Sequence, residues 1–322
     1  MTDNEAIMRI YLTVDGGTTN TRVSLVKNRQ IIATKKINRG ARAGIDDKDG
    51  LKTALRDTIA ELLSSYGLTA EDVCRIIASG MITSEFGLYE IPHATAPVGI
   101  AELHDSMTEV TFPEISQIPF VFIRGVKIDS EDLSHFDMMR GEETELMGIS
   151  VLHPVDASDK RVFVLPGSHS KIITTDESGR IADFSTMLTG EMIMSLSQNT
   201  ILKDAVDFSI DTCDPEYILK GCDFALKEGL NKVLFKVRVL KNAFKATPCE
   251  VYSFYIGAIL AEEIENIVGI DCSEIIIGGR HQIKEATAIL IEALSDKRVT
   301  VLTDSEVEGS TAIGAISIFE YA

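Results

Sequence analysis

The segment DGGTTNTR, residues 15–22, lies between two runs of strand-forming residues, Ile10–Val14 and Val23–Val26. Two β-rich runs joined by paired glycines indicate a β-hairpin. The two glycines allow the backbone to bend so that successive N–H groups face one concavity, which suits an anion. An ordinary hairpin turn is the alternative interpretation, because Asp-Gly-Gly is also good turn chemistry.

A second glycine turn, LPGSHSK at residues 165–171, repeats these features between the strand-like runs VFVL and IITT. The Gly-x-Ser-x-Gly pattern of serine hydrolases is absent, and His169 is expected to be a structural turn residue. Because both halves of the chain continue from such a hairpin into helices, a weak internal duplication predicts two related α/β lobes. A chance likeness of two glycine turns is the alternative.

Charge and composition limit the classes of function. The chain of 322 residues has 31 basic and 49 acidic residues, a net charge of −18, which disfavours binding to nucleic acid or anionic membranes. No run approaches the roughly 20 apolar residues of a membrane span, and the N-terminus does not resemble a signal peptide. The five cysteines show no C-x-x-C spacing, so neither a disulfide framework nor a zinc ribbon is expected. This cysteine usage predicts a cytoplasmic location.

The rest of the chain alternates between helical and strand patterns. Apolar residues at helical spacing run from Leu51 to Tyr66, and Gly67 supplies a stop. Residues 91–119 are punctuated by proline and predict loops around short strands. Further helices are expected from residues 140, 189, 215, 251 and 282, with strands at 31–37, 73–78, 162–165, 274–277 and 299–302.

Three further motifs could carry chemistry. RGEETEL, residues 140–146, places three carboxylates at the start of a helix, where they either complement the helix dipole or supply a general base. IIIGGR, residues 275–280, is a buried strand that opens into paired glycines, and a flat ring could approach such a backbone. GSTAIGA, residues 309–315, has small residues that permit close helix packing. The P-loop and dinucleotide-binding glycine patterns are absent.

The order of these motifs resembles the phosphate-1, connect-1, phosphate-2, adenosine and connect-2 elements of the actin, sugar-kinase and Hsp70 superfamily. Within it the chain is similar to the 2-dehydro-3-deoxygalactonokinase family, through the segments ASGMITS, MRGEETEL, LPGSHSK and STMLTGE. The resemblance implies an α/β fold of two ribonuclease-H-like lobes around a central nucleotide cleft. The expected lobes are residues 1–140 and 141–308, with a C-terminal helix, 309–322, returning to the first.

The resemblance also implies an activity. The family uses ATP and Mg²⁺ to phosphorylate the terminal C6 hydroxyl of 2-dehydro-3-deoxy-D-galactonate in D-galactonate breakdown. A kinase of another hexose or keto-deoxy sugar acid, such as the gluconate epimer, is the first alternative, and an ATP-dependent regulator is the second. Whether the chain forms a homodimer stays open.

The same resemblance assigns roles to individual residues. Asp15 is expected to organise Mg²⁺, and Arg22 or Lys171 to neutralise charge on the phosphoryl group. Nucleotide contacts are expected from Gly16, Gly17, Thr18, Thr19, Asn20, Gly167, Ser168, Gly278 and Gly279, with Thr18 and Ser168 meeting one triphosphate.

The base and the sugar contacts complete the expected site. Glu142 is the expected general base, because related sugar kinases have an aspartate after the glycine at this position, and Glu143 is the runner-up. Arg140 is the first candidate for the substrate carboxylate, ahead of Arg124 and Arg39. The remaining expected sugar contacts are Gly80, Met81, Ser84, Thr189, Gly190 and Glu191.

Overall fold

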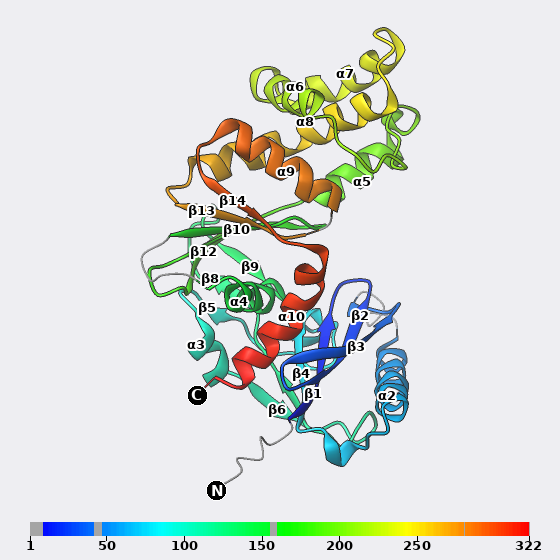
Figure 1. The fold of residues 1–322 in the computed structure, drawn as a ribbon, viewed down its shortest axis with the longest axis vertical. Coiled ribbons are helices and arrows are strands. Elements are labelled where there is room, and N and C mark those ends of the chain that lie inside the picture. Colours follow the sequence, from blue (N-terminus) through cyan, green and yellow to red (C-terminus); the bar gives the residue numbers. More distant parts are fainter. Residues whose placement is uncertain (1–8, 42–46, 155–159, 280, 322) are drawn as a thin grey trace, which may run out of the picture. The chain divides into compact units, whose positions relative to one another are not determined.

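The computed structural model describes residues 9–41, 47–154, 160–279 and 281–321. The chain forms two compact α/β units (Figure 1). The first contains the residues up to 155, residues 179–182 and the residues from 308 onward. The second contains residues 156–178 and 183–307.

The first unit is built on a six-stranded sheet with the order β3-β2-β1-β4-β7-β6. The strands β1, β2 and β3 form an antiparallel meander, and β4 and β7 continue the sheet in parallel from β1. Their bounds are β1 Ile10–Gly16, β2 Thr21–Lys27, β3 Gln30–Ile37, β4 Arg75–Gly80, β6 Thr108–Val110 and β7 Phe120–Phe122. The hairpin predicted around residues 15–22 is confirmed, because β1 and β2 pair from Ile10 to Gly16.

Helices cover this sheet. One of them, α2 (Lys48–Ser65), is the helix predicted from the spacing of apolar residues. In α2, the residues Leu51, Leu55, Ile59 and Leu62 are buried in the core with strand residues such as Leu12 and Ile76. The other elements of the unit are α3 Ile100–Asp105, α4 Glu142–Leu152, most of α10 Asp304–Phe319, short 3₁₀ turns at Ala70–Asp72 and Met81–Thr83, and a small sheet of β5 Ala94–Thr95, β8 Val126–Ile128 and β9 Asp137–Met139.

The second unit repeats the strand order of the first. Its sheet has the order β12-β11-β10-β13-β14, where β13 runs parallel to β10 and β14 runs parallel to β13. The bounds are β10 Arg161–Leu165, β11 Ser170–Thr175, β12 Ile181–Met187, β13 Glu274–Ile277 and β14 Arg298–Val301. Because β3-β2-β1-β4-β7 and β12-β11-β10-β13-β14 share this plan, the weak internal duplication is a real repeat of topology.

Helices of the second unit form one large apolar core around α8, Pro248–Gly269. Figure 1 shows α6 and α7 grouped against α8, with α9 along β13 and β14. Their bounds are α5 Thr189–Asn199, the 3₁₀ turn Ile201–Asp204, α6 Pro215–Glu228, α7 Leu230–Asn242 and α9 His281–Leu294. Asp214 caps α6 through its side chain, as the Asp-Pro pair predicts.

Three observations differ from the sequence predictions. Residues 91–119 contain the helix α3, although only loops and short strands were expected there, and α7 was not predicted. The helix α4 belongs to the first unit, whereas the expected boundary at residue 140 put it in the second. The reason is that α4 packs backbone against backbone on α10: a Cβ at Gly148 would lie 1.8 Å from the Ser310 carbonyl oxygen.

None of the described helices is both long and apolar enough to cross a membrane.

Candidate active site

The turn between β1 and β2 is fixed by backbone hydrogen bonds, and two of its residues are exposed. The Gly17 N–H donates to the Asn20 carbonyl at 2.8 Å, and the Gly17 carbonyl accepts from the Ala41 N–H at 3.1 Å. Gly40 backs the turn so closely that a Cβ there would lie 2.4 Å from the Gly17 oxygen. Thr18 and Thr19 are exposed, and the Thr19 hydroxyl accepts a hydrogen bond from the Asn20 side-chain amide at 3.0 Å.

Asp15 and Arg22 lie opposite one another on β1 and β2. Their side chains form an ion pair at 3.1 Å, with 27% and 49% of the two side chains exposed. Burial raises the pKa of the Asp15 carboxyl, Arg22 opposes this rise, and the charge of Glu142 adds to it. A carboxylate and a cation are therefore placed at the base of the first glycine turn.

Three glycines bring three elements together beside this pair. A Cβ at Gly16 would lie 2.6 Å from Ile82 Cβ, and one at Gly80 would lie 2.5 Å from the Gly16 oxygen. Gly80 and Gly141 have φ angles of +80° and +120°, which favour glycine, and a Cβ at Gly141 would lie 3.2 Å from Gly80 Cα. This corner of Gly16, Gly80 and Gly141 sets the start of α4 against the ends of β1 and β4.

The first two carboxyl groups of α4 differ in their surroundings. Glu142 is partly exposed, and its Oε2 accepts from the Arg140 N–H at 3.1 Å. Glu143 is fully buried, with Oε2 accepting from the Gly141 N–H at 2.7 Å and Oε1 from the Thr144 hydroxyl at 3.0 Å. Burial, helped by the charge of Glu142, raises the pKa of Glu143 to about 7. Glu143 thus closes the first turn of its own helix.

Glu145 belongs to the same group and was not singled out from the sequence. Burial raises its pKa to about 8, and the charges of Glu142 and Asp15 add to the rise, while Arg22 opposes it. The signal that could have found it is the i, i+3 spacing from Glu142, which places both side chains on one helix face.

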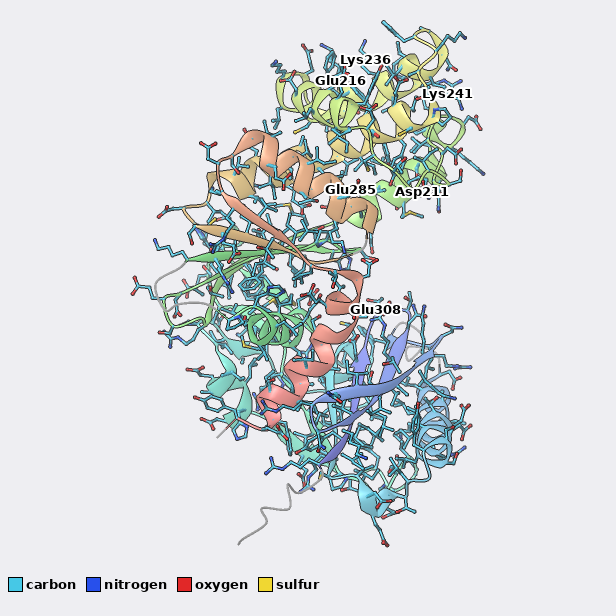
Figure 2. The ribbon with its side chains drawn as sticks, in the orientation of Figure 1. Asp211, Glu216, Lys236, Lys241, Glu285 and Glu308 are labelled. Atoms are coloured by element: carbon cyan, nitrogen blue, oxygen red, sulfur yellow. The ribbon has the colours of Figure 1, made fainter. Side chains whose placement is uncertain are left out.

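A small pocket opens beside Asp15 and Arg22 in the first unit. The strands contribute Ser79 as well as this pair, and α10 contributes Glu308 and Thr311. Figure 2 labels Glu308 on α10. The small-residue segment 309–315 is therefore both a packing surface and part of the lining of this pocket.

Among the described residues no group of three or more His, Cys, Asp or Glu side chains could hold a metal. Mg²⁺ in kinases is commonly held by one or two carboxylates, with waters and substrate phosphates completing the shell. Asp15 can supply that one carboxylate.

The guanidinium of Arg140 is already engaged by the protein. Nη1 donates to the Thr83 carbonyl at 2.8 Å and to its hydroxyl at 2.5 Å, and Nη2 donates to the Ile91 carbonyl at 3.1 Å. Burial and the charge of Arg140 lower the pKa of His93 to about 4, so neutral Nδ1 accepts a fourth bond from Nη2 at 3.2 Å. Arg140 could form two hydrogen bonds to a substrate carboxylate only if these bonds to the protein rearranged.

The other candidate cations of the first unit are also partnered. Arg124 donates through Nε to the Ser106 carbonyl at 2.8 Å, and Arg39 pairs with Asp47 at 2.7 Å. Of the expected sugar contacts, Gly80 ends β4, Met81 begins the 3₁₀ turn that follows it, and Ser84 comes directly after that turn. The Ser84 hydroxyl donates to the Met81 carbonyl at 2.7 Å, which closes that short turn.

The second glycine turn, between β10 and β11, is supported by the start of α5. A Cβ at Gly190 would lie 2.2 Å from the Gly167 oxygen, and the Glu191 N–H donates to the Ser168 carbonyl at 3.1 Å. His169 Nε2 contacts a Glu191 carboxylate oxygen at 3.1 Å, while Ser168 itself is exposed. The segment STMLTGE thus supports the second turn, in a different unit from Gly80, Met81, Ser84 and Arg140.

The paired glycines after β13 adjoin the same turn. The Gly278 N–H donates to the Val164 carbonyl at 2.9 Å, and a Cβ at Gly279 would lie 2.4 Å from the Pro166 oxygen. Arg280, the last residue of the IIIGGR motif, lies outside the described residues. Lys171, expected to neutralise phosphoryl charge, is buried on β11.

Comparison with known proteins assigns the family. The model of the 2-keto-3-deoxy-galactonokinase family matches residues 15–312, which is most of the chain. The chain belongs to this family. A relative named 2-dehydro-3-deoxygalactonokinase, from Escherichia coli strain K12, is 26% identical over 263 residues, which are 80% of each protein.

Solved structures agree in fold. A protein from Sinorhizobium meliloti provisionally named 2-dehydro-3-deoxygalactonokinase superposes with a TM-score of 0.77 at 22% identity, over 96% of this chain and 99% of that one. The activator of 2-hydroxyisocaproyl-CoA dehydratase from Clostridium difficile, with bound ADPNP, has a TM-score of 0.51 at 13% identity, over 97% and 95%. The predicted fold class, the actin-like ATPase fold, is confirmed.

Proposed function

We propose that this member of the family transfers the γ-phosphoryl group of ATP to the C6 hydroxyl of 2-dehydro-3-deoxy-D-galactonate, a step of D-galactonate degradation. The name of the family and that of the Escherichia coli relative support the substrate. The observation that carries the chemistry is the glycine corner, which sets the partly exposed Glu142 beside Asp15 and the first glycine turn.

The first turn supplies positioning and charge rather than covalent chemistry. The backbone N–H groups and hydroxyls of the exposed residues Thr18 and Thr19, with the side-chain amide of Asn20, are suited to hold phosphate oxygens, and we assign Gly167 and Ser168 the same role. The Gly17 N–H already donates to the Asn20 carbonyl, so Gly17 shapes the turn. Arg22 offsets negative charge beside Asp15. When bound with ATP through Asp15, Mg²⁺ would neutralise phosphate charge.

We assign Glu142 the role of general base. The C6 hydroxyl would lose its proton to the Glu142 carboxylate as its oxygen bonds to the γ-phosphorus, and the bond to the β-γ bridging oxygen would break to release ADP. Glu143 is the weaker candidate, because it is fully buried and both of its oxygens already accept hydrogen bonds from the protein.

Replacing the base should reduce turnover without affecting nucleotide binding. The variant Glu142→Gln is expected to lower kcat by about 10²–10⁴-fold, the usual contribution of a general base, with KM for ATP nearly unchanged. Steady-state ADP release measures both constants. Glu143→Gln is the matched comparison and should lose less; a larger loss in Glu143→Gln than in Glu142→Gln would exchange the two roles.

A substrate panel tests the proposal as a whole. ADP release should be fastest with 2-dehydro-3-deoxygalactonate and slower with its gluconate epimer and with neutral hexoses, and it should stop when EDTA removes Mg²⁺. Equal or faster turnover of the epimer would establish the alternative sugar-acid kinase. ATP hydrolysis that no sugar accelerates would instead favour a regulator.

We infer a reducing compartment, the cytoplasm, from the cysteines. All five, at positions 74, 213, 222, 249 and 272, are free thiols. Free thiols are typical of proteins that work under reducing conditions.

A further inference from the structure

Glu263 is a carboxyl group inside the apolar core of the second unit. It lies on α8 with 2% of its surface exposed, and its helix neighbours Leu260, Ile264 and Ile267 are fully buried. Burial raises the pKa of this carboxyl. An ionisable group in such a place costs folding free energy, so its presence calls for a reason other than stability.

The contacts of Glu263 lead to the second glycine turn. Its Oε2 accepts a hydrogen bond from the hydroxyl of Thr189, 2.5 Å away. Thr189 is the first residue of α5 and is 4% exposed. The hydroxyl of Ser170, the first residue of β11, also faces the carboxyl, and both hydroxyls oppose the rise of its pKa.

Two buried polar groups face each other at this place. The Ser170 hydroxyl and Glu263 Oε1 are both buried, and neither has a hydrogen-bond partner beyond this pair among the described residues. Polar atoms inside a core need such partners, so the position of Glu263 is tied to Ser170 as well as to Thr189. Glu263 therefore lies between the two segments that flank the turn, the strand side at Ser170 and the helix side at Thr189.

The residues that follow Thr189 link its position, which the hydrogen bond to Glu263 fixes, to the second glycine turn. Gly190 lies directly against the Gly167 carbonyl, where even a Cβ would come within 2.2 Å, and the Glu191 N–H donates to the Ser168 carbonyl at 3.1 Å. Gly167 and Ser168 are the residues of the turn to which we assign phosphate binding. A shift at Thr189 would thus be transmitted to them over one or two residues.

We propose that Glu263 is a positioning residue for nucleotide binding: from the core it fixes Thr189, and through Gly190 and Glu191 it holds the Gly167–Ser168 turn in the shape that binds phosphate. This role rests on the proposed kinase function. It explains why a carboxyl group is kept in an apolar core, because a rigid supporting layer improves the precision of a binding site.

The experiment separates positioning from stability. In Glu263→Leu the hydroxyl of Thr189 loses its acceptor, and we expect KM for ATP and Kd for ADP, measured by calorimetry, to rise about tenfold, which is the effect of about 1.4 kcal/mol. KM for the sugar acid should change less than twofold. The melting temperature should stay equal or increase, since replacing a buried ionic group by an apolar one is often neutral or stabilising.

Companion variants keep the test decisive if Glu263→Leu folds poorly. Glu263→Gln keeps an oxygen that accepts from Thr189 and should restore most of the ADP affinity. Thr189→Val removes the donor and should match Glu263→Leu, and the double variant should add no further loss. Glu262→Leu, at the exposed neighbouring position on α8, is the matched control and should bind ADP as the unaltered protein does.

The outcomes distinguish the two proposals. Unaltered ADP affinity in Glu263→Leu or Thr189→Val, or equal losses of ADP and sugar-acid affinity with a lowered melting temperature, would overturn the role of Glu263. If the unaltered protein itself binds no ADP, the proposed kinase function fails, and this role fails with it.

Discussion

Four carboxyl groups of the first unit, on Asp15, Glu142, Glu143 and Glu145, influence one another's ionisation, and the guanidinium of Arg22 opposes the rise in pKa at Asp15 and Glu145. Burial raises the pKa of Glu143 to about 7 and that of Glu145 to about 8, from ordinary values of 4.5. Glu143 is fully buried, whereas Glu142 is partly exposed and accessible for proton transfer. The raised pKa values of Glu143 and Glu145 also make stability depend on pH.

This dependence has a definite sign. Since the native state holds protons on Glu143 and Glu145 that the unfolded chain releases above pH 4.5, the stabilisation from these protons is complete below pH 4.5. It is lost as the pH rises through about 7 and about 8. We expect Glu145→Gln to melt at a higher temperature than the unaltered protein at pH 9, by about 2–4 °C per kcal/mol, with little difference at pH 4.5. Scanning calorimetry at several pH values checks this, and parallel curves for the two proteins would contradict it.

The glycine corner makes a second prediction for a single residue. Gly80→Ala places a Cβ 2.5 Å from the Gly16 oxygen at a φ of +80°, and should cost more than the 1–2 kcal/mol typical of left-handed backbone alone. Gly179→Ala is the matched control, because Gly179 has a φ of +76° and nothing within 4 Å of the added Cβ. Urea unfolding measures both; equal losses of unfolding free energy would show that the close approach is unimportant.

Among the elements, the pairing of α4 with α10 determines where Glu142 lies. A Cβ at Gly314 would lie 1.9 Å from the Thr144 oxygen, and one at Gly148 would lie 1.8 Å from the Ser310 oxygen. Each helix thus uses a glycine where the other presents a carbonyl. The small residues of segment 309–315 are therefore required by packing, and they bring the lining of the pocket to Asp15.

Separating these two helices should reduce both stability and turnover. Gly314→Ala forces α10 away from α4, and we expect a loss of about 1–3 kcal/mol in unfolding free energy, the usual cost of overpacking, together with a lower kcat. Gly309→Ala, on the same helix, meets only side-chain atoms at 3.4 Å and beyond, and should be neutral or gain about 0.5–1 kcal/mol. Calorimetry and ADP release compare the two, and equal effects would contradict the packing argument.

For the molecule as a whole, net charge is the property that bears on function. A protein of charge −18 that binds two anions repels both of them at long range. Raising the ionic strength from about 0.01 to 0.15 M shortens the screening length from about 30 to 8 Å. We therefore expect kcat/KM for the sugar acid to increase with KCl over this range, as measured by ADP release at fixed Mg²⁺. A steep decrease would mean that local positive charge dominates the approach of substrate.

Much of the fold could be predicted because its signals are local. The hairpin around DGGTTNTR, the helix from Leu51 to Tyr66 and the Asp214 cap depend on residues that are neighbours in the chain. The helix α3 was missed because its six residues are too few to show a period among the prolines around it. The order of the motifs along the chain was enough to indicate the family, because it can be read from the sequence without knowing any contact.

The amino-acid sequence by itself determined the alternation of strands and helices, the two glycine turns and the family. Only the tertiary structure separated Glu142 from Glu143, neighbours in one motif, because burial and hydrogen bonds depend on what packs against a helix. It also showed Arg140 bound to Thr83, 57 residues away, and Glu263 bound to Thr189, 74 residues away. Turns and helices depend on residues that are neighbours in the sequence. The hydrogen-bond partners of a charged side chain come from distant segments, which only folding brings together.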